Sequence, residues 1–179
     1  MPAVVRSYGG KHPRIGKGVF LAETCAVIGD VEIGEESSIW YSTVLRGDVM
    51  SIRIGARTSM QDGTVVHVTS EQLGTTVGDD CTIGHAAILH GCTIEDSCLI
   101  GMGSTILDGA RIGSGSLVGA GALVTPGTDI PPGSLVLGAP ARVVRPVNQK
   151  EREQIEYAAA VYIELTRRYL AGDGGSSVG

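Results

Sequence analysis

The chain has 179 residues, enough for one domain or a short repeat array and too few for two domains without a visible linker. Its 27 glycines follow no Gly-X-Y period and 42% of its residues are hydrophobic, which excludes collagen and a disordered chain. A net charge of −5 without a basic run argues against nucleic acid and anionic membranes as partners, and favours small molecules or proteins.

The start of the chain, MPAVVRSYGG, has no basic region followed by a long apolar stretch, and no apolar run has transmembrane length. The four cysteines form no C-x-x-C pair, which is typical of reduced thiols and not of a disulfide framework. We therefore expect a soluble, cytoplasmic protein.

From Ile15 to Ile130 an aliphatic residue recurs every six positions, apart from single steps of nine, eleven and five residues. Glycine often follows it, and the fourth residue after it is usually small. A hexapeptide period predicts a parallel β-helix. The aliphatic positions are Ile15, Leu21, Val27, Ile33, Ile39, Leu45, Ile54, Met60, Val66, Val77, Ile83, Leu89, Ile94, Ile100, Ile106, Ile112, Val118, Val124 and Ile130.

The fold class expected is therefore all-β, with the β-helix domain over residues 1–146. Three hexads make one triangular coil of about eighteen residues, and successive coils stack as parallel strands about 4.8 Å apart. The aliphatic side chains fill the interior. Cys25, Cys81 and Cys98 occupy the small-residue position and are expected to pack there, whereas Cys92 lies close to His90 but outside the columns discussed below.

After Pro146 the pattern becomes helical. Asn148 can cap a helix with Glu151 in the capping-box position, and apolar residues from Ile155 to Tyr169 fall on one face. We expect a C-terminal helix over residues 147–171 that packs on the β-helix, and a disordered tail over residues 172–179.

Two of the four histidines follow interior positions directly. When hexads are counted instead of residues, Val66 and Leu89 lie on the same face one coil apart, so His67 and His90 stack with their side chains outward. By the same count His85 belongs to the preceding face, with Asp62 one coil below it. The two histidine columns therefore lie on different faces of one prism.

A threefold oligomer would bring the two columns together, because each interface sets an edge of one face against an edge of another. We therefore expect a homotrimer in which His67 and His90 of one subunit meet His85 of the next. Three neutral imidazoles with one position left open are typical of a catalytic zinc site, and imidazole also suits Fe²⁺ and Co²⁺. Histidines that only hydrogen-bond at a packed interface are the competing interpretation.

The segments LRGDV, MQDGTVVHV and GHAAILHGCTI occur in the order and spacing of the γ-class carbonic anhydrase family, and the chain resembles that family from Ile15 to Pro146. The resemblance implies a left-handed parallel β-helix and a metal triad of His67, His85 and His90. It also implies reversible hydration of CO₂ to bicarbonate by a metal-bound hydroxide at a trimer interface.

Five further residues are candidates for the site. The resemblance implies that Gln61 hydrogen-bonds the hydroxide. Arg46 falls in the column of His67 and His90, so a trimer interface would bring it towards Asp62 of another chain, where a bidentate ion pair would fix the register. Asp48 is expected to orient Arg46 or a bound anion, and Tyr162 of the C-terminal helix to reach over the site.

The resemblance also implies slow turnover. Family members with strong activity carry a glutamate after the RGD sequence and another on the loop after the first histidine, where this chain has Val49 and Ser70. Glu71 is one residue away from the second position. Ser59 stands where the family has an asparagine. Without the two glutamates the proton must leave by another route, for example by transfer to a buffer molecule.

Three other functions compete with this prediction. A hexapeptide-repeat acyltransferase needs one interface histidine as base and a groove for coenzyme A, but not three histidines. A CoA-thioester hydrolase would use the same metal-bound water on a larger substrate. A trimeric scaffold or assembly protein would keep the metal for stability alone.

Overall fold

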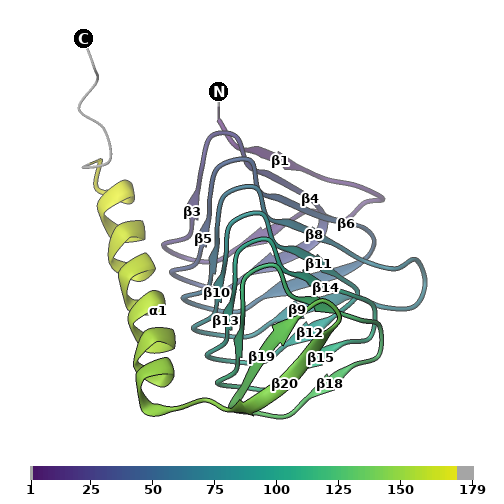
Figure 1. The fold of residues 1–179 in the computed structure, drawn as a ribbon. Helices are drawn as coiled ribbons and strands as arrows, with labels where there is room; N and C mark the ends of the chain where they lie inside the picture. The colour runs from purple at the N-terminus through teal and green to yellow at the C-terminus, as the bar shows by residue number, and fades with distance from the viewer. Residues whose placement is uncertain (1, 173–179) are drawn as a thin grey trace.

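The computed structural model describes residues 2–172. The chain winds into a parallel β-helix of about seven turns, and one α-helix lies along its side (Figure 1). The fold class expected from the hexapeptide period is confirmed. Its three faces are here called the helix-covered face, the histidine face and the third face.

The helix-covered face is an eight-stranded sheet whose strands are parallel except for the last, which pairs antiparallel with its neighbour. Its strands are β3 (Phe20–Leu21), β5 (Ser38–Ile39), β7 (Ser59–Met60), β10 (Thr82–Ile83), β13 (Leu99–Ile100), β16 (Leu117–Val118), β19 (Ser134–Gly138) and β20 (Ala141–Pro146).

The other two faces form one twelve-stranded sheet, because β4 (Ala26–Ile33) and β6 (Val44–Ile54) run around a corner and belong to both. The histidine face adds β1 (Val4–Arg6), β8 (Val65–His67), β11 (Ile88–His90), β14 (Thr105–Ile106) and β17 (Leu123–Val124). The third face adds β2 (Arg14–Ile15), β9 (Thr75–Val77), β12 (Thr93–Ile94), β15 (Arg111–Ile112) and β18 (Asp129–Ile130).

The repeated aliphatic residues fill the interior as predicted, since nearly all of them from Val27 onward are fully buried. The first position is the exception: Ile15 is 37% exposed although it pairs in register with Ile33. Strand β2 pairs with one strand only, so the first coil has a neighbour on one side and leaves the end of the prism open. Cys25, Cys81 and Cys98 are buried at the corners, as expected.

The interior column supports a stability prediction. Replacing the fully buried Ile112 with alanine should lower the free energy of unfolding by about 2–5 kcal/mol, because it removes buried methyl groups and leaves a cavity between coils. Chemical denaturation followed by circular dichroism measures this. The matched control is Leu170→Ala at a half-exposed aliphatic position, expected within about 0.5 kcal/mol of the parent protein. Equal losses in the two variants would contradict the prediction.

The helix α1 (Gln149–Leu170) begins with the capping box that the sequence predicts. Asn148 Oδ1 accepts the N–H of Glu151 at 2.9 Å, and the Glu151 carboxylate accepts the N–H of Asn148 at 2.8 Å. The aromatic rings of Phe20 and Trp40 on the helix-covered face hold the other end, where they pack against Tyr162 and Tyr169. The helix is therefore fixed at both ends against one face.

The tail expected to be disordered, residues 172–179, lies outside the described residues apart from Gly172. Between residues 2 and 172 no helix is both long and apolar enough to span a membrane.

Candidate metal centre

Two of the candidate ligands lie side by side on the histidine face. His67 ends β8 and His90 ends β11, and the two residues are direct register partners in these parallel strands. Their rings are tilted by 49° with centroids 5.1 Å apart, and His67 Nδ1 lies 3.1 Å from His90 Nε2. The stacking predicted by counting hexads is confirmed.

A carboxylate holds the opposite nitrogen of each of these rings. His67 Nε2 lies 3.2 Å from Asp48 Oδ1, and His90 Nδ1 lies 2.5 Å from Asp108 Oδ1. An ionised carboxylate only accepts hydrogen bonds, so these two ring nitrogens carry the protons of the neutral imidazoles. The nitrogens that face each other, His67 Nδ1 and His90 Nε2, are then left with lone pairs.

Two lone pairs at 3.1 Å repel one another unless a proton, in an N–H···N hydrogen bond, or a metal ion lies between them. The spacing suits a metal ion: with Zn–N bonds of about 2.0–2.1 Å in a tetrahedral site, two ligand nitrogens are about 3.3 Å apart. The spacing of His67 and His90, and the ring nitrogens they turn towards each other, are thus those expected of two neighbouring imidazole ligands.

The third histidine lies elsewhere on the chain. His85 sits in the corner turn between β10 and β11, not within the preceding face as the hexad count suggested, because its strand ends at Ile83. His85 Nδ1 lies 2.8 Å from Asp62 Oδ2, one coil below, so these two residues stack as predicted. No three His, Cys, Asp or Glu side chains converge as metal ligands within residues 2–172. Within one chain, His85 therefore does not join His67 and His90.

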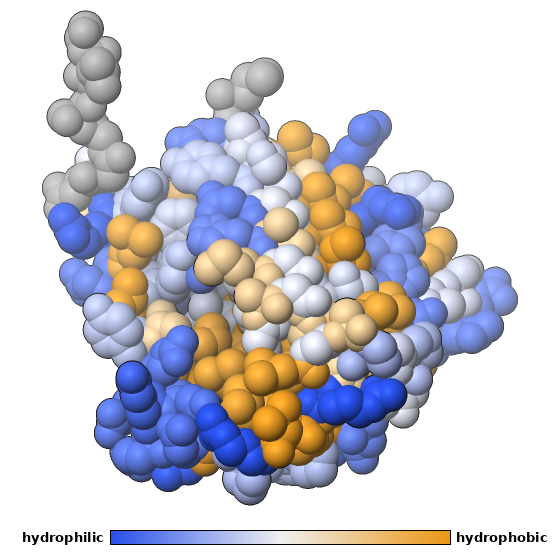
Figure 2. Space-filling model, viewed as in Figure 1, coloured by the Kyte–Doolittle hydropathy of each residue, from blue (hydrophilic) through white to orange (hydrophobic). Residues whose placement is uncertain are grey.

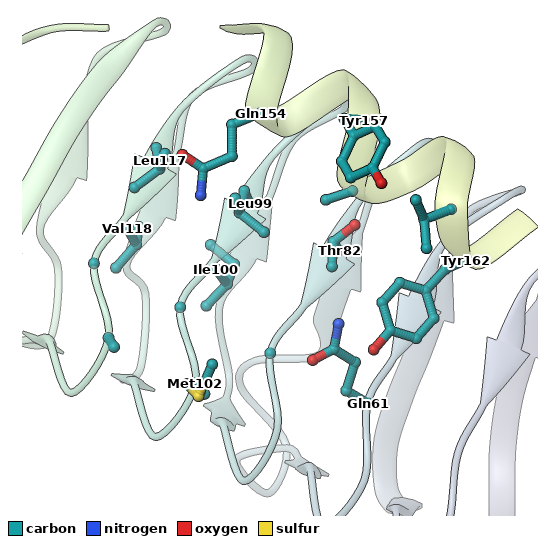
Figure 3. A pocket seen from close by; sticks show the side chains of 16 residues that line it. Gln61, Thr82, Leu99, Ile100, Met102, Leu117, Val118, Gln154, Tyr157 and Tyr162 are labelled. Carbon is teal, nitrogen blue, oxygen red and sulfur yellow. The ribbon is translucent and has the colours of Figure 1, made fainter. Parts of the chain in front are cut away.

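Gln61 and Tyr162 lie beside the His85 corner. Gln61 is 7% exposed, and its Oε1 accepts the backbone N–H of His85 at 3.1 Å, which leaves its amide NH₂ to donate. The hydroxyl of Tyr162 points towards Gln61 (Figure 3). Burial, reinforced by the charge of Asp62, raises the pKa of Tyr162 above its usual value, so the phenol stays protonated. These groups form a pair of hydrogen-bond donors.

A groove of about 590 Å³ extends from Gln61 and Tyr162 between α1 and the strands β13 and β16 (Figure 3). Its lining is apolar: Leu99 and Leu117 come from the strands, Met102 from a corner and Val161 from α1. Figure 2 shows apolar residues gathered low on this side of the molecule.

Arg46 and Asp48 are both on β6, next to His67 at the end of the neighbouring strand β8. The register of β6 with β8 places Arg46 in the column of His67 and His90, as the hexad count predicted. Arg46 forms an ion pair with Asp48, as expected for a residue that Asp48 orients. Burial opposes ionisation of Asp48, but hydrogen bonds from Arg46 and His67 outweigh it and lower the pKa of this carboxyl.

Two polar residues near the site were missed in the sequence. Asp108 binds His90, and Thr69 Oγ1 donates to Asp108 Oδ2 at 2.9 Å. The same counting could have found Asp108, because it comes two residues after the interior Ile106 and so lies above Gly91. Cys92, in contrast, belongs to the interior core, where burial raises the pKa of its thiol to about 12.

The family described as "Bacterial transferase hexapeptide (six repeats)" matches the chain at residues 74–107 and 91–126. Gamma carbonic anhydrase 2, a mitochondrial protein of Arabidopsis thaliana, is 45% identical over 162 residues; the match covers 88% of this chain and 58% of that protein. A Geobacillus kaustophilus protein named carbonic anhydrase is 45% identical over 168 residues, which cover 94% of this chain and 92% of that protein.

Among solved structures, the chain is similar to that of a Bacillus cereus protein provisionally described as an acetyltransferase. The TM-score is 0.92 at 44% identity, and the match covers 94% of this chain and 98% of the other. The names of these relatives thus point to two reactions, and the geometry of the site has to discriminate between them.

Proposed function

The chain belongs to the γ-class carbonic anhydrase family of hexapeptide-repeat proteins, and from that premise we propose that it catalyses the reversible hydration of CO₂ to bicarbonate. The reaction would take place at a metal site shared between the subunits of a homotrimer. The observation that carries the proposal is the close approach of two ring nitrogens, His67 Nδ1 and His90 Nε2, which lie 3.1 Å apart on the histidine face.

Exposed apolar residues support the shared site. Val65 and Ile88, on the strands that end in His67 and His90, are 40% and 43% exposed, although β-branched side chains at the middle of a sheet face are normally covered. The His85 corner lies beside the apolar groove under α1. A threefold interface would bury the exposed pair against the corner of the next subunit and complete the triad.

The donor set fits zinc, since three neutral imidazoles that leave one position open are its usual catalytic ligands. Iron(II) and cobalt(II) suit the same donors. His67, His85 and His90 would hold the ion. Zinc supplies Lewis acidity, which lowers the pKa of water to about 7 and so provides hydroxide at neutral pH.

The other side chains would bind and orient the substrate. The Gln61 amide and the protonated Tyr162 hydroxyl can donate hydrogen bonds to the oxygens of CO₂ and stabilise the negative charge that develops as bicarbonate forms. Arg46, tied to Asp48, offers its remaining N–H groups to bicarbonate or to Asp62 of the next subunit. Asp62 would meanwhile hold the His85 ring through Nδ1.

The proton released by the reaction has no obvious acceptor in the described part of the chain. Val49 occupies the position after the RGD sequence, and Ser70 and Glu71 lie exposed at the tip of the loop between β8 and β9. We therefore predict a turnover rate that rises with buffer concentration at constant pH and ionic strength. Stopped-flow assays across a buffer series measure this. A fast rate that does not depend on buffer would reveal a shuttle within the protein.

The apolar groove favours a second candidate, hydrolysis or transfer of an acyl thioester. Its volume of about 590 Å³ falls in the usual range for small-molecule sites, and it begins at Gln61. Such a reaction would use the same metal site on a larger substrate. It accounts for the groove, and the donors Gln61 and Tyr162 at its end would stabilise the oxyanion of an acyl intermediate as well, so assays have to discriminate between the two reactions.

One experiment distinguishes these functions. The metal-loaded protein is given CO₂ in a stopped-flow pH-indicator assay and acetyl-CoA in a thiol-release assay, each with and without an amine acceptor. Hydration of CO₂ above the buffer rate supports the proposal. Release of thiol without CO₂ hydration would replace it with the acyl reaction. No turnover of either substrate by a fully loaded protein would favour a trimeric scaffold.

A further inference from the structure

A close contact at the candidate metal centre is made by a residue that lies outside the family motifs quoted above. Asp108 lies on the corner that follows β14, one coil above His90, and the loop that carries Thr69 reaches it from below. Its Oδ1 accepts the Nδ1 proton of His90 at 2.5 Å, and its Oδ2 accepts the hydroxyl proton of Thr69 at 2.9 Å. Both carboxylate oxygens are therefore engaged.

The local backbone makes room for this arrangement. Gly91 follows His90 with a positive φ of 56°, and a Cβ atom there would come within 2.7 Å of Asp108 Oδ1 and 3.2 Å of Thr69 Oγ1. Any side chain at this position would displace the carboxylate from the ring. A glycine between His90 and the next interior strand thus has a specific structural role.

Thr69 in turn belongs to the long loop between β8 and β9. Its N–H donates to the carbonyl of Leu73 at 2.9 Å, which closes the loop, and Thr75 Oγ1 donates to the carbonyl of His67 at 2.6 Å. The bond from Thr69 to Asp108 spans 39 residues of sequence. The loop, the carboxylate and the histidine therefore form one connected unit.

We propose that Asp108, held in place by Thr69, is the positioning residue that fixes the His90 ring and its tautomer for metal binding. The inference rests on the proposed metal site and adds a residue to it. Asp108 does not touch the metal or the substrate. By keeping the proton on Nδ1, it leaves the Nε2 lone pair facing His67, whereas without it the proton can occupy Nε2 and block the ligand.

The other histidine of this face, His67, is held in a similar way, which supports the proposal. Asp48 holds His67 in the same way and is itself held by Arg46, as Asp108 is held by Thr69. Each ring on the histidine face thus has a carboxylate behind it, and each carboxylate has a second partner. Loss of such an outer partner typically weakens metal affinity by about 10- to 100-fold.

The test is the zinc dissociation constant of the trimer, measured by competition with a chromophoric chelator. Asp108→Asn and Asp108→Ala should each raise it by about 10- to 100-fold. Thr69→Val should raise it by less, and Thr69→Ser, which keeps the hydroxyl, should restore the parent value. The control is Asp129→Asn, an exposed aspartate that pairs with Arg111 on the third face, and this variant should bind zinc as the parent does.

Cobalt substitution adds a spectroscopic measurement that would not change if Asp108 only stabilised the fold. If Asp108 orients His90, the visible absorption bands of the Co²⁺-loaded protein shift in Asp108→Asn but not in Asp129→Asn, while the thermal midpoints of the metal-free proteins stay equal. Unchanged zinc affinity and cobalt spectrum in both Asp108 variants would overturn the inference. If the parent protein binds no zinc that depends on His90, the metal site itself is wrong, and the inference falls with it.

Discussion

His85→Ala and His67→Ala are each expected to remove both the bound metal and CO₂ hydration, even though the two residues lie on different parts of the chain. His67 shares its face with His90, 3.1 Å away, whereas His85 lies at a corner with Asp62. Each variant leaves only two imidazoles at every shared site. Metal analysis after dialysis and stopped-flow assays measure the two losses. His12→Ala, at an exposed histidine bonded to Ser7, is the control and should keep both.

Mixing the two inactive variants should restore activity. Trimers are assembled from equal amounts of His85→Ala and His67→Ala chains. An interface then holds all three histidines only when a His85→Ala chain supplies His67 and His90 and a His67→Ala chain supplies His85. Random assortment gives about one quarter of the parental sites. The mixture is refolded together, and its rate and metal content are compared with those of each variant alone. No recovery, from chains shown to have exchanged, would contradict a site shared between subunits.

Ile88→Asp is expected to dissociate the trimer and, with it, to abolish metal binding and activity. Ile88 is 43% exposed in the single chain, so an aspartate there is compatible with the β-helix itself. In the proposed interface the carboxylate would be buried without a partner, which costs about 3–5 kcal/mol and weakens assembly by at least about 100-fold. Sedimentation velocity and circular dichroism measure assembly and fold separately.

Val144→Asp is the matched control for this variant. Val144 is a more exposed β-branched residue on β20, the last strand of the helix-covered face and far along the prism from His67 and His90 in strand order, and its replacement should leave the trimer and the metal site intact. The interface would be misplaced if Ile88→Asp remained a metal-loaded trimer, or if both variants dissociated alike. Ile88→Arg tests the same position with the opposite charge.

Most of the fold was predictable because two features of each hexad indicate it: the interior aliphatic residue and the small corner residue. Counting hexads through the irregular steps correctly gave the register of His67 with His90 and of Asp62 with His85. It failed at the ends of elements. Ile15 is exposed because its coil has no neighbour on one side, and His85 lies in a corner because its strand is only two residues long.

The site was less predictable than the fold, since contacts between side chains depend on rotamers and loops. Within one chain Arg46 pairs with Asp48 and Asp62 with His85, while the contact between Asp62 and Arg46 of another chain stays a prediction. Asp108 lies outside the family motifs, and the spacing of the histidines does not point to it. Its role depends on Thr69, and no periodicity describes the loop that carries Thr69.

Anomalous diffraction from crystals of the zinc-loaded protein would show whether one metal ion lies between two subunits. Data collected on both sides of the zinc absorption edge locate the ion without reference to the protein. We expect one peak at each subunit interface, bonded to His67 and His90 of one chain and to His85 of the next. A fully loaded crystal whose zinc peak is bound by residues of a single chain, or lies away from these histidines, would contradict this expectation.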